Sequence, residues 1–507
     1  MVKLQYQKAS LRTIRADVAA TFVFEDKNLF RKKTQNINRL TGKSLQGLLR
    51  SKDFLGKDGE VSVVYAGKAM KSGRLMLIGL GEQKKLTLEK LRRAAASAAK
   101  RAKIMKLRRV GLEIPEYETV GKSAMKSYEK LVQALCEGAA LSIYEFHKYR
   151  SDNGGKNSKN VEGIILFSDS ARHSGDARRA KIQSQIICEA VYLARDLENA
   201  PPNEIYPESL ARTAKRVARM HRFNTKVLET NKIQKLGMGG VIAVSQGSFR
   251  PPRFIIMEHG RRNRRKTVVI VGKGVTFDTG GISLKPSSNM AAMKMDMSGA
   301  AAVIGTLQAA ARLKLPIHLV GLIPAVENMP SGTAIKPGDI VRHYNGKTSE
   351  VDNTDAEGRL ILADALGFAE KFKPAAVIDL ATLTGACVVA LGHFASGMMG
   401  NDEKLMDRLK AAGEMSYERV WPLPLYDEYE KQITSDVADV KNVGGRWAGT
   451  ITAGWFLKKF IGKYKWVHLD IAGTAILEEA HEYAPRGGSG VGVRLLIEFL
   501  RDWSGSA

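Results

Sequence analysis

Apolar positions in the second part of the chain fall into short runs rather than into an alternating pattern. Four such runs contain β-branched residues and are separated by segments with helical periodicity: Val268–Val271, Ile317–Ile323, Ala375–Leu380 and Trp466–Ile471. Strands that crossover helices bury on both faces have this character. The pattern therefore predicts an α/β domain with a central mixed, largely parallel sheet.

The first part of the chain mixes short apolar strands with helical patterns. Strands are predicted at Val61–Tyr65, Leu75–Leu80 and Val161–Phe167. The segment Lys84–Arg109 places Leu and Ala at helical spacing and carries eleven basic residues and one acid, Glu89. This composition predicts an amphipathic helix whose second face is very basic.

A longer helical pattern connects the two parts. It covers Lys181–Glu198 and ends before Pro201 and Pro202, because a residue that precedes a proline is disfavoured in the helical conformation. We therefore predict two α/β domains joined by a helix: a smaller, strongly basic N-terminal domain at 1–178, the connecting helix at 179–202 and a larger C-terminal domain at 203–507.

The charge of the chain is strongly positive, with 79 Lys and Arg against 52 Asp and Glu, a net of +27. Residues 1–180 hold 37 basic and 18 acidic side chains, a balance of +19, and the remainder carries +8. Such a field attracts polyanions, so DNA binding through the basic N-terminal domain is one interpretation. The other is a solvated helix face, which the absence of a base-reading motif favours.

Cysteine content and hydropathy indicate a cytoplasmic protein. The three cysteines, Cys136, Cys188 and Cys387, are far apart, so we expect neither a disulfide framework nor a cysteine zinc site. Residues 1–17 lack the apolar core of a secretory signal. The uncharged stretch Leu380–Gly400 contains four glycines, and we expect a buried strand, a loop and a helix start there rather than a membrane span.

Candidate catalytic side chains cluster in two glycine-bearing loops. The segment GKGVTFDTGGISLKPSSNM at 272–290 directly follows a predicted strand, MKMDMSGAA at 293–301 comes next, and VDNTDAEGRLILADAL at 351–366 leads into a helix. Together they supply Lys273, Asp278, Lys285, Asp296, Asp355, Glu357 and Arg359. In open α/β sheets ligands bind beyond the carboxyl ends of the strands, which is where these loops fall.

Four carboxylates that converge in a cleft would repel one another unless multivalent cations neutralise them. A pair of divalent cations can activate water and polarise a carbonyl, so the predicted reaction class is hydrolysis. A neutral lysine amine can be a further ligand, and a protonated lysine can stabilise an oxyanion. Taken singly, each residue also fits a turn, a helix cap or a solvated charge.

The motif NTDAEGRL at 353–360 resembles the signature of the leucyl aminopeptidase, or cytosol aminopeptidase, family of dinuclear metallopeptidases. The resemblance continues in order along residues 180–507 and is looser in the first part. It rests further on the segments GKGVTFDTGGISLKPS at 272–287, MKMDMSGAA at 293–301, DLATLTGA at 379–386, SDVADVKNVGGR at 435–446 and HLDIAGTA at 468–475.

The resemblance implies a complete catalytic site with two divalent cations, Mn²⁺ or Zn²⁺. One cation would be held by Lys273, Asp278, Asp296 and Glu357, and the more exchangeable one by Asp278, Asp355 and Glu357. A metal-bridging water or hydroxide would attack the scissile carbonyl, and Lys285 would stabilise the oxyanion. Arg359 would hold a bicarbonate ion that shuttles the proton in place of a protein base.

The resemblance also implies the substrate class and the assembly. Peptides with a free N-terminus would be the substrates, and Leu or another hydrophobic residue would be released. The substrate-binding positions are matched by Met293, Asn353, Thr382 and Ala475. A homohexamer is implied, with no membrane partner. The alternative function is a DNA-binding accessory or architectural protein, as a second role or with peptidase activity lost, and the intact ligand set argues against that loss.

Overall fold

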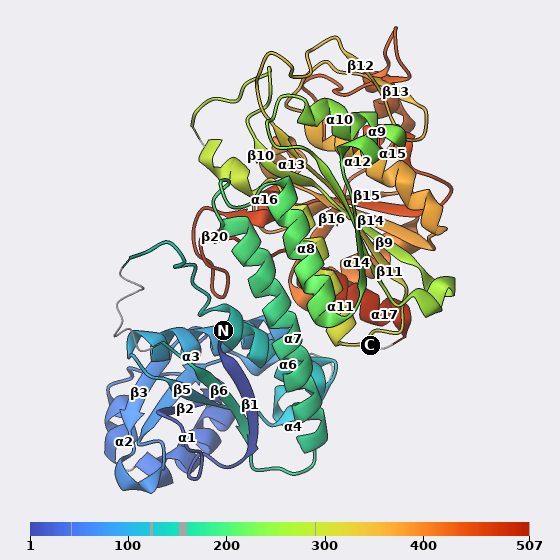
Figure 1. The fold of residues 1–507 in the computed structure, drawn as a ribbon. Helices are drawn as coiled ribbons and strands as arrows, with labels where there is room; N and C mark the ends of the chain where they lie inside the picture. The colour runs from blue at the N-terminus through green and yellow to red at the C-terminus, as the bar shows by residue number, and fades with distance from the viewer. Residues whose placement is uncertain (42, 122–124, 152–159, 289, 506–507) are drawn as a thin grey trace. The chain divides into compact units, whose positions relative to one another are not determined.

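Two compact α/β units make up the protein, as the sequence predicts (Figure 1). The computed structural model describes all residues except 42, 122–124, 152–159, 289 and 506–507. The first unit comprises Met1–Glu189 and Glu479–Pro485, and the second comprises Ala190–Glu478 and Arg486–Ala507. Each unit has its own sheet and its own core.

The first unit contains a six-stranded sheet in the order β1-β6-β5-β2-β4-β3. Its strands are β1 (Lys3–Lys8), β2 (Val18–Val23), β3 (Val61–Tyr65), β4 (Arg74–Gly79), β5 (Arg109–Glu113) and β6 (Gly163–Ser168). Only β3 runs antiparallel to its neighbour among these strands. The three strands expected from the sequence are therefore confirmed as β3, β4 and β6.

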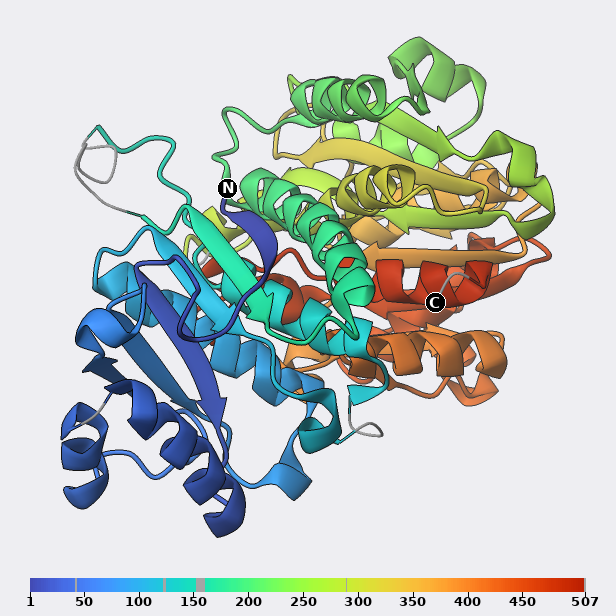
Figure 2. The same cartoon turned by 90° about the horizontal axis from the view of Figure 1, so that it is seen from below.

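Helices cover both faces of this sheet (Figure 2). One face packs on α1 and α2 through a cluster that includes Ile37, Leu45 and Leu77. On the other face α3 and α6 pack against each other. The helices of the unit are α1 (Lys27–Thr41), α2 (Lys43–Arg50), α3 (Leu88–Ile104), α4 (Tyr117–Val120), α6 (Tyr128–Leu141) and the first part of α7 (Ser174–Asn199).

The basic helix is shorter than the sequence suggested. Helix α3 begins at Leu88 because the Thr87 hydroxyl caps it by accepting a hydrogen bond from the backbone N–H of Lys90. Residues Gln83–Lys85 form a separate short 3₁₀ turn, and Arg109 already belongs to β5. Tertiary pairing of β5 in the sheet therefore ends the helical segment before its last basic residues.

Much of the basic face of α3 is neutralised inside its own unit. Arg92 is buried, and its Nε donates to Glu137 Oε2 at 2.8 Å. Further ion pairs on this helix join Lys90 to Asp58, Arg93 to Glu89 and Lys103 to Glu145. The helix is thus not a uniformly solvated basic surface, as periodicity alone suggested.

We expect Glu137→Ala to lower the free energy of unfolding by about 3 kcal/mol, because the Arg92 guanidinium would remain buried without the carboxylate that its Nε contacts at 2.8 Å. Urea unfolding followed by circular dichroism measures this change. The matched control is Glu162→Ala, whose partner Arg108 is exposed, so the loss there should stay below about 1 kcal/mol. Equal losses in the two variants would contradict the importance of the buried pair.

The second unit is built on a nine-stranded mixed sheet with a parallel centre. Strands β18, β14, β9 and β11 are adjacent and parallel, and β10 adds to β11 in parallel. These four adjacent strands confirm the four runs expected from the sequence. The sheet comprises β7 (Asn224–Leu228), β8 (Arg253–His259), β9 (Val268–Gly272), β10 (Gly274–Asp278), β11 (Leu319–Asn328), β14 (Ala376–Ala381), β15 (Ser396–Gly400), β16 (Val420–Pro422) and β18 (Lys465–Asp470).

Two layers of helices enclose this sheet (Figure 1). Helices α8, α11 and α17 pack together on one face, and α10, α12 and α15 pack on the other, over a core that includes Leu362, Phe456 and Trp466. The helices are α8 (Pro207–His221), α9 (Thr230–Lys235), α10 (Gly239–Ser245), α11 (Ser298–Arg312), α12 (Glu357–Ala369), α13 (Gly385–Leu391), α14 (Glu403–Ser416), α15 (Gly449–Phe460), α16 (Ala472–Ala475) and α17 (Val493–Ser504).

Two small sheets complete the second unit. One sheet contains β12 (Ile340–Arg342), β13 (Thr348–Glu350) and β17 (Val440–Lys441). The other pairs β19 (Ile476–Leu477) with β20 (Gly487–Gly488). The uncharged stretch Leu380–Gly400 contains the end of β14, a short loop and α13, as expected, and the strand β15, which was not expected, follows. Within the described residues, no helix has the length and apolar character needed to cross a membrane.

Candidate metal centre

The predicted catalytic side chains meet at the carboxyl edge of the second sheet. Lys273 follows β9, Asp278 is the last residue of β10, and Thr382 follows β14. Strands β9 and β14 are parallel neighbours, so their carboxyl ends lie at one edge. Helix α12 begins at this edge with Glu357, two residues after Asp355. The loop after β9 and the start of α12 thus bring the two sequence motifs together at this edge.

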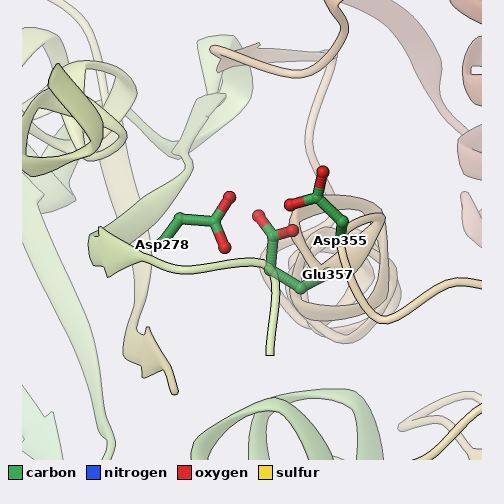
Figure 3. A group of neighbouring side chains, drawn as sticks. All are labelled: Asp278, Asp355 and Glu357. Atoms are coloured by element: carbon green, nitrogen blue, oxygen red, sulfur yellow. The ribbon is translucent and has the colours of Figure 1, made fainter. Parts of the chain in front are cut away.

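Three carboxylates form the centre of the site (Figure 3). Asp278, Asp355 and Glu357 each offer one oxygen, and these oxygens all lie within 4.8 Å of one another. Asp278 comes from the end of β10, whereas Asp355 and Glu357 come from the start of α12. This spacing allows one divalent cation to contact all three.

Lys273 joins this group to a fourth carboxylate. Its Nζ lies 2.8 Å from Asp296 Oδ2 and 2.9 Å from Glu357 Oε1, and donates to the carbonyl oxygen of Thr382 at 3.0 Å. The residue after Glu357 must be glycine for this approach, because a Cβ on Gly358 would stand 2.8 Å from Lys273 Nζ. Burial alone would lower the pKa of Lys273, but the surrounding carboxylates, Asp296 first, raise this pKa overall.

Lys285 occupies the more open side of the cluster, with 22% of its side chain exposed. Its Nζ lies 2.9 Å from Asp278 Oδ2 and also contacts Asp355. Burial lowers the pKa of Lys285, and the neighbouring carboxylates, Asp278 first, more than reverse the effect. The ammonium therefore stays charged beside the three carboxylates.

Two ammonium groups do not balance four carboxylates in a buried site. Burial raises the pKa of Asp296, Glu357 and Asp355, and the lysines offset this only in part. Three of the carboxylate oxygens, Asp296 Oδ2, Asp355 Oδ1 and Glu357 Oε1, are buried without a well-directed hydrogen bond. These oxygens have only the lysine Nζ atoms beside them, and a site with surplus negative charge fits divalent cations.

Hydrogen bonds from residues that the sequence did not single out hold the ligands in place. Asn328, at the end of β11, donates to Asp278 Oδ1 at 2.8 Å and to the Thr354 carbonyl at 3.1 Å. Asn442 accepts from the backbone N–H groups of Asp352 and Asn353 and donates to the Asn353 carbonyl. For Asn328, the available sequence signal was an amide at the end of a buried strand. For Asn442, the available signal was the KNVGGR motif.

Arg359 lies two residues after Glu357 on α12 and is buried. Its guanidinium donates to the Asn442 carbonyl at 2.7 Å, while its Nε has no hydrogen-bond partner within the described residues. Burial lowers the pKa of Arg359 to about 10, against the attraction of Glu357 and Asp470. A buried arginine with an unused N–H is suited to a small oxyanion.

The four predicted substrate positions have different surroundings. The Thr382 hydroxyl donates to Asp296 Oδ1 at 2.6 Å, and the Met293 carbonyl accepts from the Asp296 N–H at 3.3 Å. The Asn353 side chain accepts from the backbone N–H of Asp355 at 2.8 Å. Ala475 is buried at the end of α16, where its carbonyl accepts from Ser489. The first three therefore form hydrogen bonds with candidate ligand residues.

Comparison with known proteins places both units in one family. Residues 192–497 match the Cytosol aminopeptidase family, catalytic domain, and residues 20–153 match the N-terminal domain of the same family. A probable cytosol aminopeptidase of Geobacter sp. (strain M21) is 46% identical over 461 residues, covering 91% of this chain and 92% of that protein. One from Roseiflexus castenholzii is 44% identical over 462 residues, covering 91% and 93%.

Solved structures agree with this relationship. The bottromycin maturation enzyme BotP in complex with Mn superposes with a TM-score of 0.84 at 34% identity, covering 96% of this chain and all of that one. A mutant of tomato leucine aminopeptidase gives a TM-score of 0.86 at 30% identity, covering 99% and 96%. The similarity therefore spans both units rather than the site alone.

Proposed function

Because the chain belongs to the cytosol aminopeptidase family and is therefore a peptidase that hydrolyses peptides from the N-terminus, we propose that it is a dinuclear metallo-aminopeptidase that prefers Leu and other hydrophobic N-terminal residues. The observation that carries the proposal is the buried group of four carboxylates with two lysines at the carboxyl edge of the sheet.

The ligand assignment is the one that the family resemblance implies, and the closeness of these side chains supports it. Lys273, Asp278, Asp296 and Glu357 would hold one cation, with Lys273 giving up its proton to do so. The set Asp278, Asp355 and Glu357, whose oxygens lie within 4.8 Å of one another, would hold the second. Bound Mn²⁺ or Zn²⁺ would polarise the scissile carbonyl and activate the attacking water. The manganese complex of the similar BotP structure supports metal binding.

Two basic residues would act on the substrate and on the proton. Lys285 is partly exposed and stays protonated, so its ammonium would stabilise the negative charge that develops on the carbonyl oxygen. Arg359 would hold bicarbonate through its unused Nε–H, and this anion would carry the proton that a protein base usually carries. No histidine is needed in this scheme.

Substrate binding would use the residues around Asp296. Thr382 and Met293 contact that ligand, so both lie beside the place where the first residue of a peptide would be held. With Ala475 they would form an apolar pocket for the first side chain, and Asn353 would orient the loop of Asp355. Apolar walls of this kind favour Leu over charged residues.

We propose a homohexameric, cytoplasmic enzyme, supported by the family to which the chain belongs and by the cytosolic names of its relatives. A DNA-binding role is not proposed, because the basic helix α3 is largely paired with acidic residues of its own unit.

The proposal is tested by hydrolysis of leucine p-nitroanilide. Stripping with a chelator should lower the rate about 100-fold, and Mn²⁺ or Zn²⁺ should restore it, because the carboxylate cluster needs cations to activate water. N-acetyl-leucine p-nitroanilide is the matched control and should not be hydrolysed, since its amine is blocked. Folded protein without metal-dependent turnover, or with equal turnover of both substrates, would refute the proposal.

A further inference from the structure

A second cavity lies at the opposite edge of the same sheet, away from the metal centre. Its volume is about 670 Å³, and it lies between the β7–β8 pair and the chain that follows α12. His318 precedes β11 and Lys373 precedes β14, so the cavity opens near the amino ends of the parallel strands. Because β14 alone spans about 20 Å, the cavity is separate from the carboxyl-edge site.

Unpaired cations line this cavity. Lys226, Lys371 and Lys373 all belong to its wall, and none of them has an ion-pair partner among the residues that the structure describes. Lys226 lies on the edge strand β7, where a lysine also discourages pairing with another sheet. That explanation does not apply to Lys371 and Lys373, which lie outside any strand.

The acid in the wall does not neutralise these lysines. Glu258 is buried and is already engaged by His318 Nε2 at 2.9 Å and by Arg261 Nε at 2.6 Å. Both contacts lower the pKa of Glu258 although burial opposes them, so it stays ionised and orients Arg261. The cavity therefore has a surplus of positive charge, which a bound anion would relieve.

The remaining wall offers a platform for a ring. Phe372 is partly exposed and packs edge to face on Phe368, with the two centroids 6.0 Å apart, whereas Phe368 itself is only 4% exposed and lies under Lys371 Nζ. Aromatic side chains stack readily on planar bases.

From this combination we infer a binding site for a small phosphate ester that carries an aromatic ring, as a nucleoside monophosphate does. The lysines would contact the phosphate, and Phe372 would contact the ring. The volume is within the range of small-molecule sites and exceeds what a single phosphate fills. This inference is independent of peptide hydrolysis, because none of these residues belongs to the metal centre.

Isothermal titration calorimetry on the full-length protein tests the inference, with AMP as probe and adenosine and inorganic phosphate as its two halves. We expect AMP to saturate one site below about 1 mM and each half to bind about tenfold more weakly. The double variant Lys226→Met/Lys371→Met should weaken AMP binding about tenfold, because two phosphate contacts are lost. Phe372→Leu should weaken AMP binding but leave phosphate binding unchanged.

The controls separate this site from the metal centre and from a general charge effect. Lys215→Met/Lys404→Met makes the same charge change on α8 and α14 and should leave AMP binding unchanged, as should Glu357→Ala. Three results would overturn the inference: no saturation by AMP, equal affinity in both double variants, or phosphate that binds as tightly as AMP. Duplex DNA that binds more tightly through the same lysines would also overturn it, in favour of a polyanion surface.

Discussion

Glu357→Ala should lower kcat/KM for leucine p-nitroanilide by about 10⁴-fold, because the same carboxylate takes part in both proposed cation sites. Glu357 is buried, lies in the three-carboxylate group and contacts Lys273 Nζ at 2.9 Å. Its removal would leave Lys273 with one carboxylate neighbour fewer. Each proposed cation site would also lose one ligand. Steady-state kinetics with saturating Mn²⁺ measures the effect, and metal content by atomic emission shows its origin.

Two further variants test whether the loss of activity is specific to the charge of the Glu357 carboxylate. Glu403→Ala removes an exposed glutamate from the first turn of α14 and should retain full activity. Glu357→Gln keeps the shape of the side chain but not its charge, so it should also lose most activity. Appreciable turnover by folded Glu357→Ala would show that the assignment of the metal centre is wrong.

Lys285→Met should lower kcat by about 10³-fold, or about 4 kcal/mol of transition-state stabilisation, and change KM little. The ammonium of Lys285 reaches Asp278 and Asp355 from the more open side of the cluster, where a substrate carbonyl would enter. Its proposed contact forms as charge develops on that oxygen, so the loss should fall on the chemical step. Kinetics at saturating substrate and metal measure it.

The control for this variant is Lys336→Met, which removes an exposed lysine whose ion pair with Asp339 lies elsewhere on the surface. We expect it to leave kcat unchanged. Lys285→Arg should recover part of the activity, because it restores the positive charge on a side chain of different shape. A fall in metal content rather than in kcat would mean that Lys285 stabilises the cation site and not the oxyanion.

Sequence patterns predicted the central strands well because their signal is local. A strand buried on both faces must be apolar along its length, and β9, β11, β14 and β18 have that composition. Strand β8 was not anticipated although it contains the run Phe254–Met257, because short apolar runs fit a strand or a buried helix equally well. Its antiparallel pairing with β11 settles its conformation.

Element ends were less predictable than element types. Periodicity extended the basic helix to Arg109, whereas the Thr87 cap and the pairing of β5 confine it to Leu88–Ile104. The burial of Arg92 was likewise invisible, since its partner Glu137 lies on α6, far along the chain. Charge counts therefore overestimated how much of this helix faces water.

For the site, the sequence alone determined which residue types are present and where they cluster. Lys273, Asp278 and Lys285 lie within one loop region, and Asp355, Glu357 and Arg359 lie within another, so local motifs and the family they resemble identified them together. Strand ends expose such loops at one edge of a parallel sheet, which made a common site a reasonable prediction.

Only the tertiary structure decided which groups meet. Lys273 lies between Asp296 and Glu357, Asn328 supports Asp278, and Asn442 links the loop of Asp355 to Arg359, although these partners are far apart in sequence. The amino-edge cavity likewise gathers Lys226, Glu258 and Lys371 from separate segments. Propensity and hydrophobic pattern act over a few neighbouring residues, whereas these contacts depend on how distant elements pack, and periodicity does not encode that packing.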